Sequence, residues 1–386
     1  MRLFDWRTRV VTAAVVVASG LLALPMAPAQ AADSGTLIDV TAQAPGWRGL
    51  AHGYAVNYWT ERSNGAPVQA SGALILPDGP APEGGWPIMA YDHGTSGLGP
   101  NCGGQSDTTR VKRAKEDQFL QYLVSKGFAV VAPDYLGLGG FETGPHPYLE
   151  LRSEATATID LVQAARAARP ELSRTWSVIG FSQGGHAALG AAHLQSTRAP
   201  ELDFRGTIAV DPASDVEKFV PLAGPYVPDI PGDNGNAVDT FIVSMLVGLR
   251  ETRPDLDLDS YLTPRGREVF DQAGSLCFMD IMKITNGLSI GDLLNRPLTD
   301  PRFRAAITDY MAVPVNGYDE PILLLLNLTD VTVPSPLHVA LAGQFAANGV
   351  DFTTVTGTGS HTELNPPMWA AIDAFIARVL ATPTQA

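Results

Sequence analysis

The stretch Trp176-Ser177-Val178-Ile179-Gly180-Phe181-Ser182-Gln183-Gly184-Gly185 decides the fold of this chain. An apolar, strand-like run leads into Gly-x-Ser-x-Gly, and the small residues that follow predict a helix over 184–194. So tight a strand-to-helix turn needs glycine on both sides of the serine, and it lifts the hydroxyl clear of the sheet. The first amides of the helix then face the hydroxyl, where negative charge can be stabilised. We therefore expect Ser182 to be a nucleophile, with an ordinary helix-capping serine as the alternative.

Segments on both sides of this stretch alternate between strand-like and helix-like patterns. This alternation predicts an α/β protein with a mainly parallel central sheet flanked by helices. The rhythm breaks between 215 and 314, where helix-like runs are separated by Pro, Asp and Gly, so we expect a mostly helical insertion there. The main domain would then comprise 33–214 and 315–386. The expected strands are 54–62, 69–76, 87–91, 128–132, 204–210, 321–328 and 352–356; the expected helices are 118–126, 150–169, 237–250, 264–273, 301–311, 337–347 and 367–380.

The N-terminus has the pattern of an export signal. Three arginines precede the uncharged run 10–26, and the small residues Ala29-Gln30-Ala31 provide a cleavage pattern. A membrane anchor is the alternative, because 10–32 is almost long enough to span a bilayer. We expect residues 1–32 to be a cleaved signal peptide and the mature protein to be secreted.

The formal net charge of −14 argues against nucleic-acid partners and against docking on anionic membranes. No later apolar stretch is long enough to span a bilayer, so we expect no stable membrane insertion. Transient contact with a lipid interface and the oligomeric state are left open by the sequence.

The chain has two cysteines, Cys102 and Cys277, which form no Cys-x-x-Cys and have no histidine at metal-ligand spacing. In an oxidising compartment a disulfide between them is expected, with two buried thiols as the alternative. The glycines of 137–140 lack the lysine or helix of a nucleotide-binding loop. We therefore expect no metal and no cofactor.

A serine nucleophile needs a base, and the base needs an acid that orients it. His361 and His338 both lie beyond the insertion; we favour His361, which falls in a loop after the last expected strand, whereas His338 falls in a helix. For the acid we favour Asp330, because its strand should neighbour the one that delivers His361. Asp211, at the end of the strand after the nucleophile helix, is the alternative.

An oxyanion needs two preorganised N–H donors. We expect one from the backbone of Gln183. The other should come from the loop 93–97, where we choose Thr95, with Gly94 and Ser96 as competitors. His93 precedes the nucleophile and is expected to shape this loop rather than to act as base.

Two further patterns are expected to carry no function. The aspartate-rich runs 233–236 and 255–259 lack the spacing of a calcium loop and are interpreted as solvated loop. Asn327-Leu328-Thr329 matches a glycosylation sequon but falls on an expected core strand.

Three motifs together resemble the secretory lipase family, whose best-studied members are yeast lipases of the lipase A type. They are Tyr91-Asp92-His93-Gly94-Thr95, the run 131–139 (Val-Ala-Pro-Asp-Tyr-Leu-Gly-Leu-Gly), and 180–185 around Ser182. The resemblance covers nearly all of the mature chain. It implies the α/β-hydrolase fold, a triad of Ser182, Asp330 and His361, and a cap over an acyl-binding pocket.

The predicted activity is cleavage of carboxylic esters through a covalent Ser182 intermediate, with lipid or medium-chain acyl esters as substrates. The apolar runs 241–249 and 277–284 would line the acyl pocket or form ordinary core. An acyltransferase, a polar-ester or polyester hydrolase and a peptidase share this frame. A non-catalytic binding protein is the alternative of a different class.

Overall fold

The computed structural model describes residues 33–105, 113–230 and 232–382. The expected signal peptide, 1–32, lies outside this range. The chain from Ala32 to Ala386 forms one compact unit.

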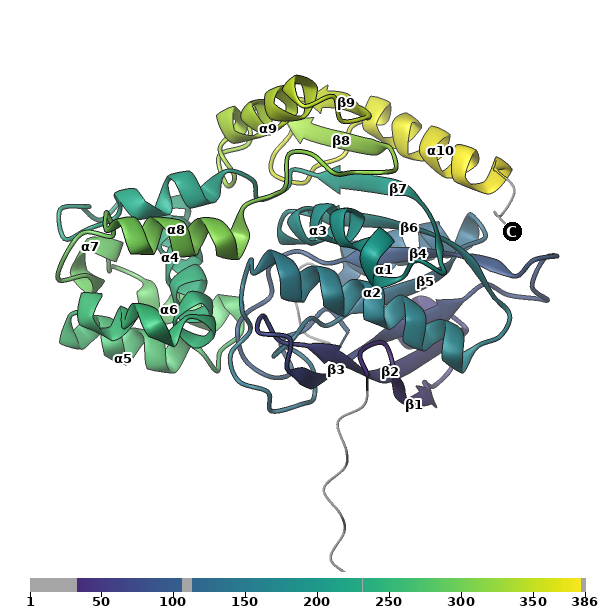
Figure 1. Cartoon of the computed structure of the whole chain (residues 1–386), viewed down its shortest axis with the longest axis horizontal. Helices are drawn as coiled ribbons and strands as arrows, with labels where there is room; N and C mark the ends of the chain where they lie inside the picture. The colour runs from purple at the N-terminus through teal and green to yellow at the C-terminus, as the bar shows by residue number, and fades with distance from the viewer. Residues whose placement is uncertain (1–32, 106–112, 231, 383–386) are drawn as a thin grey trace, which may run out of the picture. The chain divides into compact units, whose positions relative to one another are not determined.

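A single mixed sheet organises the described residues, with strand order β1-β2-β3-β5-β4-β6-β7-β8-β9 (Figure 1). The first three strands pair antiparallel, and β3 pairs antiparallel with β5. Every pair from β5 to β9 is parallel. The predicted mainly parallel sheet is therefore confirmed. The strands are β1 (Leu37–Ala42), β2 (His52–Glu61), β3 (Pro67–Leu76), β4 (Trp86–Asp92), β5 (Ala129–Pro133), β6 (Leu172–Phe181), β7 (Asp203–Val210), β8 (Ile322–Asn327) and β9 (Phe352–Gly357).

Helices cover both faces of the sheet because successive strand residues point to opposite sides. On β8, Ile322, Leu324 and Leu326 pack with helix α9, whereas Leu323 and Leu325 pack with helix α10. Helices α2 and α3 pack on the same face of the sheet as α9. Helix α1 packs on the opposite face, together with α10. The helices are α1 (Arg113–Ser125), α2 (Leu151–Ala168), α3 (Gln183–Arg198), α9 (Ser335–Ala347) and α10 (Pro366–Ala381).

Between β7 and β8 the described residues form helices and turns but no strand, and in Figure 1 these helices gather beside the sheet. They bury an apolar cluster of their own, which also takes in Leu98, Tyr148 and Leu149 from the loops of the sheet. Two short helices, α6 and α7, were not among those expected. The helices are α4 (Asp233–Thr252), α5 (Pro264–Ala273), α6 (Phe278–Thr285), α7 (Ile290–Leu293) and α8 (Pro301–Met311). Within the described ranges no helix is both long and apolar enough to cross a membrane.

A disulfide joins Cys102 to Cys277, with their Cα atoms 5.2 Å apart. Backbone pairing accompanies it, because Leu98 N–H donates to the Leu276 carbonyl at 2.9 Å and Phe278 N–H donates to the Ser96 carbonyl at 2.8 Å. The loop after β4 is thus joined to the segment that opens α6.

Candidate active site

Ser182 occupies the turn between β6 and α3 with φ 59° and ψ −119°, a conformation that L-residues rarely adopt. Its N–H donates to the Val210 carbonyl at 2.9 Å, which ties the turn to β7. A Cβ on Gly180 would overlap the Gly184 carbonyl, and one on Gly184 would overlap the Asp92 carbonyl. Only glycine fits at these two positions, so this pair of glycines allows the chain to present Ser182, which is a partly exposed residue.

His361 lies between β9 and α10 and reaches both Ser182 and Asp330. Its Nε2 is 2.8 Å from Ser182 Oγ, and its Nδ1 is 2.5 Å from Asp330 Oδ2. Asp330 follows β8, the parallel neighbour of β9, so adjacent strand ends deliver the two side chains. The structure therefore brings the predicted nucleophile, base and acid together in one hydrogen-bonded chain.

The carboxyl group of Asp330 is buried and accepts several donors. Burial by itself raises the pKa of Asp330, but hydrogen bonds from His338 and His361 outweigh it and hold that pKa well below its usual range. An ionised Asp330 can only accept, so His361 carries a proton on Nδ1 and leaves Nε2 free to accept the Ser182 hydroxyl proton.

Asp211, the alternative acid, contributes to the same region in another way. Its carboxylate accepts Asn327 N–H at 2.7 Å, the Asn327 side-chain amide at 2.8 Å and Thr362 N–H at 2.7 Å. Asn327 in turn accepts Gly359 N–H at 3.1 Å and donates to the Glu363 carbonyl at 2.9 Å. Asp211 and Asn327 together fasten the loop that carries His361 to the end of β8.

His338 does not reach Ser182, but it is more than a packing residue. It is fully buried on α9, and its Nε2 lies 3.1 Å from Asp330 Oδ2. Sequence reasoning missed this contact, although a histidine eight residues after the expected acid was a signal for it.

Among the described residues, Asp211, Asp330 and His338 are grouped closely enough to hold a metal ion by position alone. The oxygens of both carboxylates, however, already accept the hydrogen bonds given above. The two carboxylates of this group are therefore engaged within the protein.

The loop 93–97, which we call the donor loop, lies against the strand-to-helix turn. A Cβ on Gly94 would be 3.3 Å from the Phe181 carbonyl oxygen and 3.8 Å from Ser182 Cβ. Thr95 is partly exposed, and its hydroxyl is 2.9 Å from the hydroxyl of Tyr148. His93 is buried and donates from Nδ1 to the Gly94 carbonyl at 2.7 Å, an arrangement that shapes the loop.

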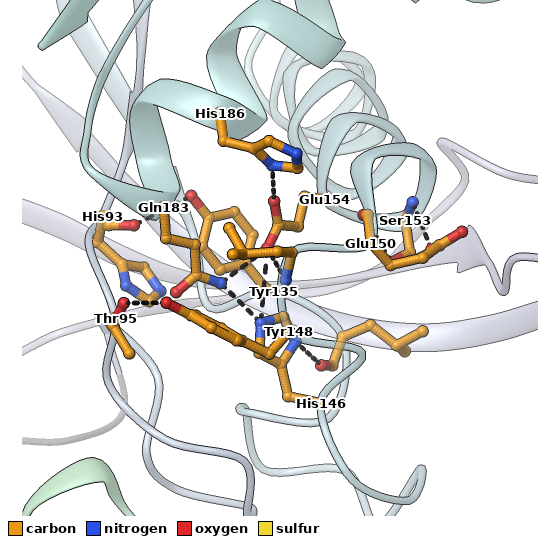
Figure 2. A network of polar contacts seen from close by, with 12 residues as sticks. His93, Thr95, Tyr135, His146, Tyr148, Glu150, Ser153, Glu154, Gln183 and His186 are labelled. Carbon is orange, nitrogen blue, oxygen red and sulfur yellow. Dashed lines mark hydrogen bonds and ion pairs between the residues drawn. The ribbon is translucent and has the colours of Figure 1, made fainter. Parts of the chain in front are cut away.

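Gln183, immediately after the nucleophile, extends its side chain into a buried polar network (Figure 2). Its amide donates to Glu154 Oε1 at 2.8 Å and to His146 Nε2 at 2.7 Å. Glu154 also accepts His186 Nδ1–H at 2.9 Å and Leu149 N–H at 3.0 Å. The side chains of Glu154, His146, Gln183 and His186 are fully buried.

This network, which we call the Glu154 network, joins the start of α3 to the insertion. His186 Nε2 is 2.9 Å from the carbonyl of Met311, the last residue of α8, and Tyr310 donates to the Tyr148 carbonyl at 2.8 Å. Sequence reasoning missed the network, whose only local signal was a glutamate among small residues on the apolar face of α2.

The fold and this geometry define a lipase-type α/β hydrolase. The chain matches the secretory lipase family over residues 104–378 and belongs to it, as the motifs around Ser182 had indicated.

Two relatives are similar at the sequence level. A Mycobacterium tuberculosis protein named as a probable inactive lipase is 24% identical over 329 residues, which cover 80% of this chain and 69% of the relative. Lipase A of Arthroderma benhamiae is 27% identical over 246 residues, which cover 59% of this chain and 47% of that lipase.

Solved structures share the fold. Lipase A of Candida antarctica in its closed state superposes with a TM-score of 0.72 at 18% identity, over 92% of this chain and 84% of that one. The rice cell wall degrading esterase LipA of Xanthomonas oryzae gives a TM-score of 0.69 at 22% identity, over 90% and 97%.

Proposed function

We propose that this protein is a secreted serine ester hydrolase that cleaves carboxylic esters of lipids or medium-chain acids. The observation that carries the proposal is the position of His361, within hydrogen-bond distance of Ser182 Oγ on one side and of Asp330 Oδ2 on the other. A base so placed can remove the hydroxyl proton as Ser182 attacks a carbonyl carbon.

In the first half-reaction Ser182 Oγ bonds to the ester carbonyl carbon while its proton moves to His361 Nε2. The carbonyl electron pair moves onto oxygen, and the backbone N–H groups of Gln183 and Thr95 stabilise this oxyanion. When the tetrahedral intermediate collapses, the ester C–O bond breaks and His361 returns the proton to the leaving alcohol. An acyl-Ser182 intermediate remains.

In the second half-reaction water attacks the acyl carbon and gives a proton to His361. Collapse releases the carboxylic acid, and the proton returns to Ser182 Oγ. Asp330 stays ionised throughout, and its negative charge stabilises the imidazolium that forms twice per turnover.

An aromatic series beside the donor loop supports an apolar acyl site. Tyr148, which contacts Thr95, stacks with Phe241 of α4, and Phe241 stacks with Phe278 of α6, with ring centroids 6.5 and 5.0 Å apart. Phe241 and Phe278 are partly exposed, whereas most of 241–249 is buried core. We accordingly propose that the insertion 215–314 acts as a cap whose Phe241 and Phe278 contact the acyl chain.

Export is proposed from the signal-like pattern of 1–32 and is supported by the family's description as secretory and by the disulfide. The expected partner is an ester substrate.

A non-catalytic role is the second reading, because one relative is named as a probable inactive lipase. This chain keeps a serine, a histidine and an aspartate in hydrogen-bonded contact, which favours catalysis. Labelling by a fluorophosphonate probe separates the two readings: a catalytic Ser182 is labelled, and a binding protein is not.

The deciding experiment measures hydrolysis of p-nitrophenyl esters from acetyl to palmitoyl, above and below their solubility limits. Ser182→Ala should lower kcat by about 10⁴- to 10⁶-fold, whereas Ser196→Ala, an exposed serine on the same helix, should leave the rate unchanged. Full activity in Ser182→Ala would refute the assignment. An optimum at acetyl would argue against a lipid substrate, and faster transfer to an added alcohol than to water would identify an acyltransferase.

A further inference from the structure

Two histidines converge on one oxygen of the proposed catalytic acid. Asp330 Oδ2 is 2.5 Å from His361 Nδ1 and 3.1 Å from His338 Nε2. The other oxygen, Oδ1, accepts the N–H groups of Thr332 at 2.8 Å and Val333 at 3.2 Å. The turn after β8 thus holds one oxygen, and the two imidazoles share the other.

The direction of the hydrogen bond from His338 follows from its partners. Asp330 is an ionised acceptor, so His338 must donate through Nε2–H. Its other nitrogen, Nδ1, is buried and has no hydrogen-bond partner among the residues that the structure describes. A proton there would be a buried donor with no acceptor, which is costlier than an unpaired lone pair on a neutral ring. His338 therefore carries a single proton, on Nε2.

The surroundings of His338 favour a hydrogen bond over a metal ion. A metal would take the Nε2 lone pair and would need Asp330 Oδ2, the oxygen that holds His361. Asp211, whose Oδ1 is 3.6 Å from His338 Nε2, is already engaged by Asn327 and Thr362. Asp215 also faces α9: it accepts the Gln344 side-chain amide at 2.8 Å and pairs with Lys218.

We propose that His338 is a positioning residue of the active site: by donating Nε2–H to Asp330 Oδ2, it orients the carboxylate toward His361 and limits how strongly that oxygen attracts the imidazolium. The proposal rests on the catalytic roles assigned to Asp330 and His361. It adds a fourth side chain to the hydrogen-bonded chain of Ser182, His361 and Asp330.

Loss of this donor has two consequences. The carboxylate loses one of its constraints, so the rate falls. Without the His338 donor, Oδ2 also attracts the His361 imidazolium more strongly. The imidazolium becomes more stable, so His361 is protonated up to a higher pH. The acid limb of the kcat/KM profile should then move to higher pH, because that limb reports the base of the free enzyme.

The test compares kcat/KM against pH on a soluble p-nitrophenyl ester for wild type, His338→Leu and His338→Gln. Leucine fills the volume without a donor, whereas the glutamine amide can place an N–H near the position of Nε2. In His338→Leu the plateau value of kcat/KM should fall by about 10- to 100-fold. The apparent pKa of the acid limb should rise by about half a unit or more. In His338→Gln the limb should stay in place, with the plateau within about threefold of wild type.

Val339→Ala, an exposed neighbour on α9, controls for changes in the helix itself and should match wild type. An unmoved limb in His338→Leu, or equal profiles for the leucine and glutamine variants, would overturn the proposal and leave the ester-hydrolase assignment intact. Full activity in Ser182→Ala would instead remove that assignment.

A measurement on the wild-type protein does not depend on the folding of a variant. With ¹⁵N-labelled histidine, the Nε2–H form of His338 should be observed at neutral pH. A neutral His338 with its single proton on Nδ1 would refute the hydrogen-bond direction on which the proposal depends.

Discussion

The two sides of Ser182 are built differently. On one side the Glu154 network supports Gln183 from helices α2 and α3 and from the loop of His146, and its four charged or polar side chains are fully buried. On the other side Asp330 and His361 sit on loops after strands, and the imidazole of His361 keeps 11% of its surface exposed. The first side is also cross-linked to the insertion by the disulfide and by hydrogen bonds to α8.

This difference separates two tasks. A buried network with a partner for nearly every atom holds the Gln183 side chain, next to Ser182, in one geometry, and its loss would appear mainly as lost stability. A base that carries protons must meet the substrate, so it lies on a loop, and its loss would appear mainly as lost rate. Substitutions on the two sides should therefore separate loss of rate from loss of stability.

The largest effect is expected for Asp330→Asn. The amide cannot hold His361 in the tautomer that accepts the serine proton, so kcat should fall by about 10⁴-fold. The same change at exposed Asp351 is the control.

Because the folded-state pKa of Asp330 is lowered, its ionisation contributes stability above an unfolded pKa of about 3.9, and this contribution is lost as pH falls further. The stability gap between wild type and Asp330→Asn should therefore narrow from pH 5 to pH 3 in urea titrations; a gap that widens would contradict the assignment.

Reduction of the Cys102–Cys277 disulfide should destabilise the protein next most strongly. The bond spans 175 residues of sequence, and the loop-entropy model gives it about 5 kcal/mol, which strain would reduce. Thermal unfolding with and without dithiothreitol measures the effect. The double Cys102→Ser, Cys277→Ser variant lacks the disulfide without added reductant and should unfold at the same temperature as the reduced protein. An unchanged Tm under reduction would show that the disulfide does not stabilise the donor-loop side.

Glu154→Gln tests the Glu154 network. An amide in this place must direct its N–H₂ group toward either His186 or the donors Gln183 and Leu149, so we expect about 3–5 kcal/mol of lost stability. Glu201→Gln, which alters an exposed carboxylate, should change stability by less than about 0.5 kcal/mol. If Glu154→Gln kept its stability and lost only activity, the division between the two sides would be wrong.

The smallest effect concerns His146, whose pKa is lowered by burial in the folded state. The unfolded chain then binds more protons below an unfolded pKa of about 6.5, so the contribution of this histidine is present above that pH and is lost as pH falls. His146→Asn keeps a donor for the Leu136 carbonyl and cannot titrate. Its stability should depend less steeply on pH between 7.5 and 5.5, by at most about 1.4 kcal/mol per unit, with exposed His52→Asn as the control. A slope as steep as that of wild type would argue against a buried neutral His146.

Much of this architecture is readable from the chain because it depends on local patterns. The two glycines and the small-residue helix around Ser182 define a strand-to-helix turn. The order of residues along the chain left two candidates for the base and two for the acid. The family match and the sheet confirm the predicted fold. The roles of the individual residues stay predictions, although the geometry brings Ser182, His361 and Asp330 together.

The features that were missed depend on contacts between distant segments or on very short elements. Glu154 meets Gln183 only after α2 and α3 pack, and His338 meets Asp330 only after α9 docks on the sheet. The helix α7 is four residues long and begins with a capping box at Ser289, too short for periodicity to detect. The edge strand β1 is largely solvated and shows no clear alternation.

Asn327 has a practical consequence for producing this protein. It is the acceptor of the chain's only Asn-x-Ser/Thr sequon, yet its side chain is fully buried between Asp211 and the loop of His361. In a eukaryotic secretory host, a glycan attached before β8 packs would leave no way to form these contacts. Expression in such a host should therefore yield a misfolded glycosylated fraction and an active unglycosylated one, and a bacterial host avoids this loss.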